Sequence, residues 1–294
     1  MRVSLQHRGL LALLGLVFMA APALAQNPDT VDPEQNTANA KKLLEQAVAA
    51  LGGSAFQNSV ESDCEGRAAH FDRGGGTLGY TFVHTYWRFP DKNRTEYIVK
   101  STKGGIFAIF VGNLPVKGGE FIQVFNGDKG WTMDKGGVNE ADATVVEEFQ
   151  DTVKRQLHNL LLNRVHEEGV FLRFAGLGIA DLRQVDWVEI SDRDGRVVRL
   201  ALEHGSHLPM RTVVSTPNQE MRDTDEDVTI FSNYKEHEGV QTPMQVSREH
   251  NGRRTYQIFY NSCNNNPNLP ANFFTDASLQ ERFVKTGGKV KPQK

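Results

Sequence analysis

Apolar side chains recur at every second residue along much of this chain. Between Leu78 and Tyr86, within the run that ends at Phe89, bulky side chains at even positions alternate with small or β-branched ones at odd positions. This alternation is typical of a β-strand whose two faces have different surroundings. Ten further runs predict strands, over residues 94–100, 106–111, 121–125, 170–174, 185–190, 197–202, 208–214, 228–234, 244–250 and 255–260. Of these, the runs over 106–111 and 121–125 are apolar on both faces.

Glycine-containing dipeptides separate many of these runs. Asn126-Gly127 precedes Trp131, and two-residue hairpin loops favour such a pair. Similar pairs end in Gly195, Gly205, Gly239 and Gly252, each between successive strands. The spacing therefore predicts an antiparallel meander of about eleven strands.

Two segments have helical periodicity instead. The first begins at Thr37, a candidate N-cap, and ends at Gly52-Gly53. The second runs from Asp142 to His166 and has one apolar stripe. A meander with helices on one side is an α+β fold. Two helices can cover only part of so wide a sheet. The uncovered part would form an apolar concavity, which is a favoured type of ligand site.

The N-terminus resembles an export signal. Arg2 and Arg8 precede an apolar run over residues 9–20, and Ala23-Leu24-Ala25 is a small-residue cleavage site. The run is well short of the ~20 residues that span a bilayer. We therefore expect cleavage after Ala25 and localisation in the periplasm of a bacterium.

The composition disfavours a nucleic-acid partner and does not decide whether the two cysteines form a disulfide. Without residues 1–25, 31 basic and 36 acidic residues remain, a formal net charge of −5. This balance disfavours nucleic acid, whose binders have a basic face. Cys64 and Cys263 could form a disulfide in an oxidising compartment, or could remain buried thiols.

Candidate catalytic and metal-binding residues are sparse. His204 and His207 lie three residues apart in a predicted turn, without further clustered ligands, so surface histidines are the better interpretation. The acidic run over residues 223–227 lacks the glycine and distal glutamate of a calcium loop and predicts a solvated loop. No nucleophile motif is present. The sequence therefore predicts no enzyme, no cofactor and no metal.

Three short motifs resemble a known family. Val124–Trp131 is similar to the "dG…GW" hairpin of secreted bacterial proteins in the LolA/LolB-like superfamily. Ile230–Tyr234, followed by Glu238-Gly239-Val240 and Pro243, resembles their late hairpin, and Leu51-Gly52-Gly53 fits the end of their opening helix. The order of elements from Ala38 to about Phe274 also agrees. The similarity is greater to uncharacterised secreted relatives than to the lipoprotein carrier itself.

The resemblance implies a half-open, strongly curved antiparallel sheet, a half-barrel with helices covering its concave face. In the carrier, this cavity holds lipoprotein acyl chains. The resulting organisation is a signal peptide (1–25), a flexible lead-in (26–36), a curved-sheet domain (37–284) and a disordered basic tail (285–294). The implied function is a periplasmic carrier or binding protein for a lipid or lipoprotein acyl chains.

Counting every second residue suggests which side chains form the cavity face. The candidate ligand-binding residues are Tyr80, Phe82, Tyr86, Tyr97, Val99, Leu200, Leu202, Met210, Met244, Val246, Tyr256 and Ile258. Ordinary core packing explains each of them individually, so the prediction concerns the set. The alternative hypothesis is an interaction or sensor module on the same scaffold, with a packed interior and an envelope protein as its partner.

Overall fold

A single antiparallel sheet dominates the molecule. The computed structural model describes residues 28–287 apart from residues 73, 100–108, 112–113, 117–118, 194 and 219–222. Its main sheet has 13 strands in the order β8-β7-β6-β3-β2-β1-β15-β14-β13-β12-β11-β10-β9. These strands are β1 (Glu61–Phe71), β2 (Thr77–Arg88), β3 (Lys92–Val99), β6 (Gly119–Asn126), β7 (Lys129–Asp134), β8 (Gly137–Glu140), β9 (Phe171–Ala180), β10 (Arg183–Ser191), β11 (Val197–Glu203), β12 (Pro209–Asn218), β13 (Asp223–His237), β14 (Val240–His250) and β15 (Arg253–Asn265).

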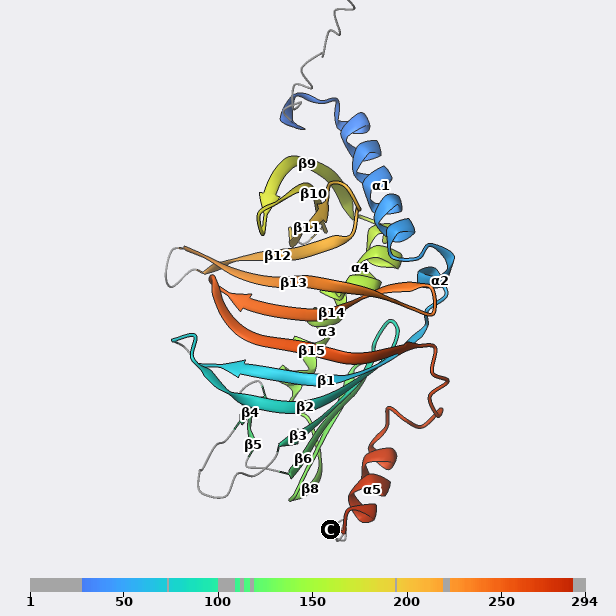
Figure 1. Ribbon diagram of the computed structural model, residues 1–294, viewed down its shortest axis with the longest axis vertical. Coiled ribbons are helices and arrows are strands. Elements are labelled where there is room, and N and C mark those ends of the chain that lie inside the picture. The colour runs from blue at the N-terminus through green and yellow to red at the C-terminus, as the bar shows by residue number, and fades with distance from the viewer. Residues whose placement is uncertain are drawn as a thin grey trace, which may run out of the picture.

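The sheet curves strongly and does not close. The two edge strands, β8 and β9, lie at opposite ends, and the direction of the strands rotates steadily between them (Figure 1). Each neighbouring pair is antiparallel, as the glycine-containing turns predicted. The expected α+β fold with a half-open curved sheet is therefore confirmed, with more strands than the eleven predicted.

Helices cover the two faces at different places. They are α1 (Pro33–Ala50), α2 (Ser54–Gln57), α3 (Ala143–Arg155), α4 (Leu157–Leu162) and α5 (Asp276–Lys285), with short 3-10 turns at Pro28–Thr30 and Arg164–His166. We call the face under α1, α3 and α4 the inner face, and the opposite one the outer face. No helix among the described residues is both long and apolar enough to cross a membrane.

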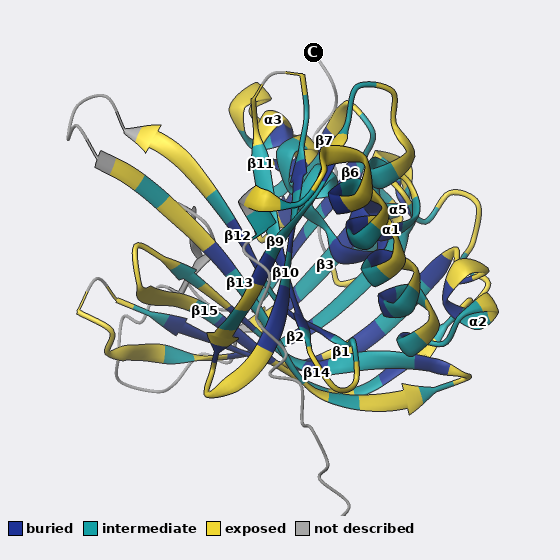
Figure 2. Cartoon of the chain, turned by 90° about the horizontal axis from the view of Figure 1, so that it is seen from above, coloured by how far each residue is buried: buried dark blue, intermediate teal, exposed yellow. Residues whose placement is uncertain are grey.

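At the β9–β11 end, the inner face forms a closed aliphatic core. Leu200 and Leu202 of β11 are fully buried against Leu44 of α1 and Leu160 of α4. Every second residue of β11 faces these helices, which is why this strand has aliphatic side chains at those positions. Mid-strand segments are buried, whereas the hairpin ends are exposed (Figure 2).

The predicted helix over residues 142–166 is wrong in one respect, because it is two helices. Gln156 has an extended backbone (φ −61°, ψ 130°) and ends α3. Its side-chain oxygen accepts a hydrogen bond from the Asn159 backbone N–H at 2.8 Å, which caps α4. The break directs two parts of one apolar stripe to different cores: Phe149 of α3 packs on Phe125 of β6, and Leu160 of α4 joins the closed core.

Both ends of the described chain also differ from the prediction. Helix α1 begins at Pro33, because Asp32 accepts hydrogen bonds from the backbone N–H groups of Glu34 and Gln35. Thr37, the predicted cap, instead donates to the Leu172 carbonyl at 3.2 Å. Helix α5 was not predicted, because its two buried apolar residues, Leu279 and Phe283, give little periodicity.

Several strand predictions also need correction. Strands β1, β7 and β8 were not among the predicted runs. The acidic run over residues 223–227 belongs to β13, paired with β12, rather than to a loop. The predicted strand over residues 106–111 is described only as β4 (Ile109–Val111), which pairs with β5 (Leu114–Val116) outside the main sheet. Residues 1–27 and 288–294, which include the predicted signal peptide and most of the basic tail, lie outside the described residues.

Candidate functional site

A cavity lies on the inner face between the central strands and the helices α2, α3 and α4. Its volume is about 410 Å³, within the range of about 300–1,000 Å³ for small-molecule sites. Strands β1, β2, β13, β14 and β15 form its floor. The side chains around it include Leu51, Phe56, Ser62, Cys64, Thr85, Trp87, Phe89, Arg155, Leu157, His158, Asp227, Val228, Thr229, Phe231, Val240, Val246, Arg248, Glu249, Tyr260 and Asn265.

One end of the cavity is aromatic and uncharged at neutral pH. His158 of α4 stacks on Phe89, with ring centroids 3.8 Å apart, and lies 5.1 Å from the ring of Phe56. Burial lowers the pKa of His158 to about 4, and the nearby carbonyls of Ser59 and Phe56 oppose this shift only partly. The neutral imidazole therefore contributes an aromatic surface to the wall.

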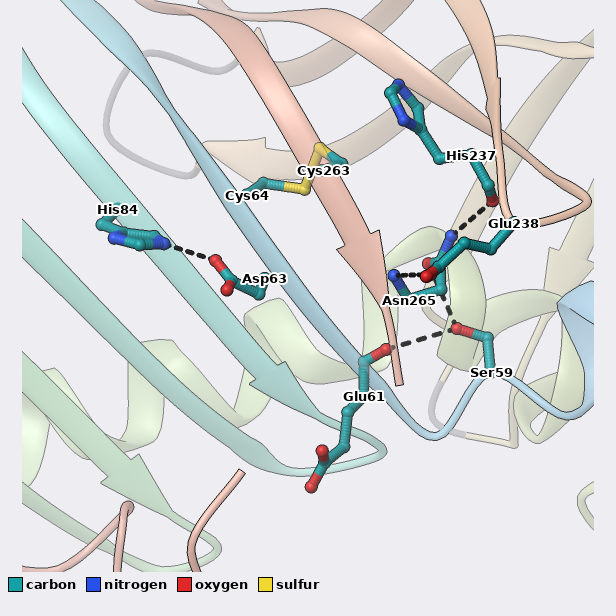
Figure 3. Close-up of a disulfide and its surroundings, with 9 residues drawn as sticks. All are labelled: Ser59, Glu61, Asp63, Cys64, His84, His237, Glu238, Cys263 and Asn265. Carbon is teal, nitrogen blue, oxygen red and sulfur yellow. Dashed lines mark hydrogen bonds and ion pairs between the residues drawn. A yellow bond between two sulfur atoms is a disulfide. The ribbon is translucent and has the colours of Figure 1, made fainter. Parts of the chain in front are cut away.

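The disulfide and a hydrogen-bond network fix the floor near this end. Cys64 of β1 and Cys263 of β15 are bonded across adjacent strands, which confirms the predicted pair (Figure 3). Asn265 lies two residues further along β15. Its backbone N–H donates to the Glu238 carboxylate at 2.7 Å, and its side-chain amide donates to the His237 carbonyl at 2.9 Å. These contacts hold the β13–β14 turn against the end of β15.

The same turn also meets the end of α1. The Gln241 backbone N–H donates to the Leu51 carbonyl at 2.9 Å. Gly52 approaches so closely that a Cβ there would lie 2.2 Å from the Gly239 carbonyl oxygen, and its φ of +125° also requires glycine. This explains why the Leu51-Gly52-Gly53 motif and the late hairpin motif occur together, since they form one contact.

The other end of the cavity carries the charges. Arg155, the last residue of α3, lies 3.6 Å from the Asp227 carboxylate of β13. The Asp227 carboxylate also contacts His250 Nδ1 at 3.0 Å. Arg248 and Glu249 of β14 complete this end. The Arg155–Asp227 pair thus connects the helical wall to the sheet.

The structure separates the twelve residues proposed for the cavity face. Val246 lines the cavity, and Tyr97, Met244, Tyr256 and Ile258 lie on the same inner face. Leu200 and Leu202 lie in the closed core, where α1 and α4 leave no access. The side chain of Val99 lies outside the described residues.

The four remaining residues of that set lie on the outer face, which requires a correction. Val83, Thr85 and Trp87 face inward on β2, so Tyr80, Phe82 and Tyr86 between them face outward. Tyr86 packs on Phe273 before α5, and Tyr80 is 65% exposed. Met210 packs with Ala201, which faces away from the closed core. Alternation identifies two faces but not which one is concave, and the outer face is also apolar where the segment containing α5 covers it.

Polar groups outside the cavity do not assemble a metal site. His204 contacts the buried Asp186 carboxylate at 2.8 Å. On the outer face, His84 lies between the Asp63 carboxylate and the Tyr86 hydroxyl (Figure 3 shows the first contact). Among the described residues, no group of three or more His, Cys, Asp or Glu side chains could hold a metal ion.

Comparison with known proteins identifies the fold. No protein-family model matches the chain, and no curated protein sequence matches it. A DUF1329 family protein from Desulfovibrio piger has a TM-score of 0.54 at 13% identity, covering 85% of this chain and 100% of that one. A putative outer membrane lipoprotein-sorting protein domain from Vibrio parahaemolyticus has a TM-score of 0.52 at 10% identity, covering 83% and 100%. The resemblance inferred from the hairpin motifs is confirmed as a likeness of fold.

Proposed function

We propose that the protein is a carrier or binding protein that holds a hydrophobic ligand, a lipid or lipoprotein acyl chains, in this cavity. The observation that supports the proposal is the cavity itself, because the inner-face helices leave about 410 Å³ open above the central strands. Burial of an acyl chain there would contribute about 0.8 kcal/mol per methylene group. The lipoprotein-sorting annotation of one structural neighbour agrees with this type of ligand.

Entry of a ligand would require movement of the helical wall. The extended backbone at Gln156 divides α3 from α4, and a rotation of the two helices about this residue would open the wall. At the charged end, α3 is connected to the floor by the Arg155–Asp227 contact, in which both side chains are partly exposed. Exposed ion pairs contribute little, typically about 0.2–1 kcal/mol, so this contact is easily opened.

A cavity-filling variant tests the proposal. Val246→Trp places a large side chain in the cavity, and Tyr80→Trp places the same side chain on the exposed outer face of β2. We expect the wild-type protein and the Tyr80→Trp variant to bind N-phenyl-1-naphthylamine, an uncharged fluorescent probe, and Val246→Trp to bind it at least tenfold more weakly. Equal binding by both variants, with circular dichroism showing that both are folded, would exclude this cavity as the site.

We also propose that the protein works in the periplasm after cleavage behind Ala25. The disulfide between Cys64 and Cys263 supports an oxidising compartment. Mass spectrometry of protein recovered from the periplasm of its host should give a chain beginning at Gln26. A chain that retains residues 1–25, or that remains with the cytoplasmic fraction, would contradict this localisation.

The edge strand β9 favours a second candidate function, binding of another envelope protein by strand addition. Asn36 of α1 hydrogen-bonds both the N–H and the carbonyl of Phe174, which covers the first half of this edge. No hydrogen bond from another element, within the described part of the chain, covers the edge at Leu177–Ala180. Leu177 and Ile179 are 45% and 78% exposed. Such an apolar edge can accept an extended segment of a partner.

Site-specific crosslinking distinguishes this candidate from the carrier. A photo-crosslinking residue at Ile179 should trap one defined envelope protein in the host, whereas the same residue at Tyr80 should not. Adding Asn36→Ala should leave the product unchanged, because Asn36 covers a different half of the strand. Absence of a specific product at Ile179 would reject the strand-addition hypothesis without affecting the carrier proposal.

A further inference from the structure

The charged side chains of the cavity all lie at one end. Strand β14 runs along the floor from Val240, beside the aromatic end, to Arg248 at the other. Eight strand residues span about 26 Å. Arg155, Asp227, Arg248 and Glu249 surround the far end, whereas the other lining residues carry no charge while His158 is neutral.

The charges at this end do not cancel, because the carboxylates already have arginine partners. Asp227 lies 3.6 Å from Arg155, and Glu249 lies 4.0 Å from Arg254 of β15. The guanidinium of Arg248 has no hydrogen bond or ion pair with any residue that the structure describes. The unbalanced charge at this end of the cavity is therefore positive.

The neighbours of Arg248 do not neutralise it. Tyr256 is its cross-strand partner on β15, and Tyr97 and Tyr260 lie nearby on the same face. Burial raises the pKa of each of these hydroxyls, that of Tyr260 to about 12, so all three stay uncharged at neutral pH. On the other side, the cross-strand partner is Thr229, an uncharged residue that also lines the cavity.

The geometry points to an acyl chain with an anionic head group, a carboxylate or a phosphate, as the ligand class. The head group would pair with the Arg248 guanidinium, which binds such oxyanions in a bidentate manner. The chain would extend toward Phe56 and Leu157 at the uncharged end. The available length exceeds the roughly 15 Å that an acyl chain occupies in one leaflet of a bilayer. This inference rests on the proposed carrier function and specifies its ligand.

Matched amphiphiles test the head-group site separately from the carrier function. Palmitate and hexadecanol have equal chain lengths and differ in the charge of the head group. We expect the purified protein, titrated below the critical micelle concentration, to bind palmitate about tenfold more tightly than hexadecanol. Palmitoyl lysophosphatidate should bind at least as tightly as palmitate, and inorganic phosphate alone should not displace either.

Variants of Arg248 and of an exposed arginine outside the cavity supply the control. Arg248→Gln should bind palmitate about tenfold more weakly and leave hexadecanol binding unchanged, whereas Arg248→Lys should retain most of the preference. Arg193→Gln should behave as the wild type, because Arg193 is exposed, pairs with Glu168 and does not line the cavity.

Three outcomes would overturn the assignment. They are equal binding of palmitate and hexadecanol by the wild type, an unchanged preference in Arg248→Gln, and tight binding of inorganic phosphate alone at Arg248. Failure of the carrier function itself would look different, because neither amphiphile would then bind.

Discussion

The inner face is packed differently at the β9–β11 end and over the central strands. At the β9–β11 end, α1 and α4 cover the strands completely, and the strand positions facing them are aliphatic, as at Leu172, Val188 and Leu200. Over the central strands, the facing positions include Ser62, Thr85 and other polar residues, and a cavity remains. The first arrangement maximises buried apolar contact, whereas the second leaves it incomplete.

This difference shows where stability and binding reside. The closed core can contribute most of the packing free energy, so the central region can keep unfilled volume. The disulfide lies in the floor of this open region and joins β1 to β15. Empty space in a protein is costly, and a site that persists nevertheless is a candidate for function.

The largest expected effect on stability comes from truncating a side chain in the closed core, compared with the same kind of truncation beside the cavity. Leu200→Ala, in the closed core, should lower the free energy of unfolding by about 2–5 kcal/mol, because it creates a new cavity. Val246→Ala borders existing space and should cost about 1 kcal/mol or less. Urea denaturation of both variants measures this difference. Equal losses would show that the central region is packed as tightly as the closed core.

Removing the cross-link should affect the open region next. The double variant Cys64→Ala/Cys263→Ala should lose about 2–4 kcal/mol, because the bond joins residues separated by 199 positions and restricts the unfolded chain. Reduction of the wild type should give the same loss in urea denaturation, and reductant should not affect the double variant. A loss below 1 kcal/mol would indicate that strand pairing alone holds this part of the floor.

Acid should destabilise the boundary between the two regions. His158 has a pKa of about 4 in the folded protein, against 6.5 ordinarily, because it is buried. Below pH 6.5 the unfolded chain binds a proton that the folded protein does not, so stability falls between about pH 6.5 and 4 by up to about 3 kcal/mol.

The variant His158→Phe isolates this contribution. It should flatten the decline in denaturation midpoint measured from pH 7 to 4, leaving the part due to other groups such as His70, whose pKa burial also lowers. An unchanged pH profile in this variant would mean that the pKa of His158 is the same in the folded and the unfolded protein.

The smallest effect concerns the contact across the charged end. Arg155→Gln should lower the stability by less than about 1 kcal/mol, because both partners of the Asp227 pair are partly exposed. It should nevertheless speed the uptake of an uncharged probe in stopped-flow experiments, since α3 would separate more readily from β13. Lys154→Gln, which removes a charge paired within α3, is the control and should leave the uptake rate unchanged.

Much of the fold was predictable, and the candidate site was predictable only in part. Alternation located most strands, and the glycine turns gave the hairpins, because both signals are local. The cavity-lining residues Ser62, Thr85, Thr229 and Asn265 gave no signal, since isolated polar residues on strands resemble solvent-facing ones. Arg155 and Arg248 were similarly indistinguishable from surface arginines.

The sequence by itself determined the antiparallel meander, the opening helix and the pair of cysteines available for a bond, since each depends on neighbouring residues or on residue type. The tertiary structure decided which face of β2 is concave, where the stripe from Asp142 to His166 breaks, and which arginine lacks a partner. Those properties depend on how residues far apart in the chain approach one another, and periodicity along a single strand carries no record of that approach.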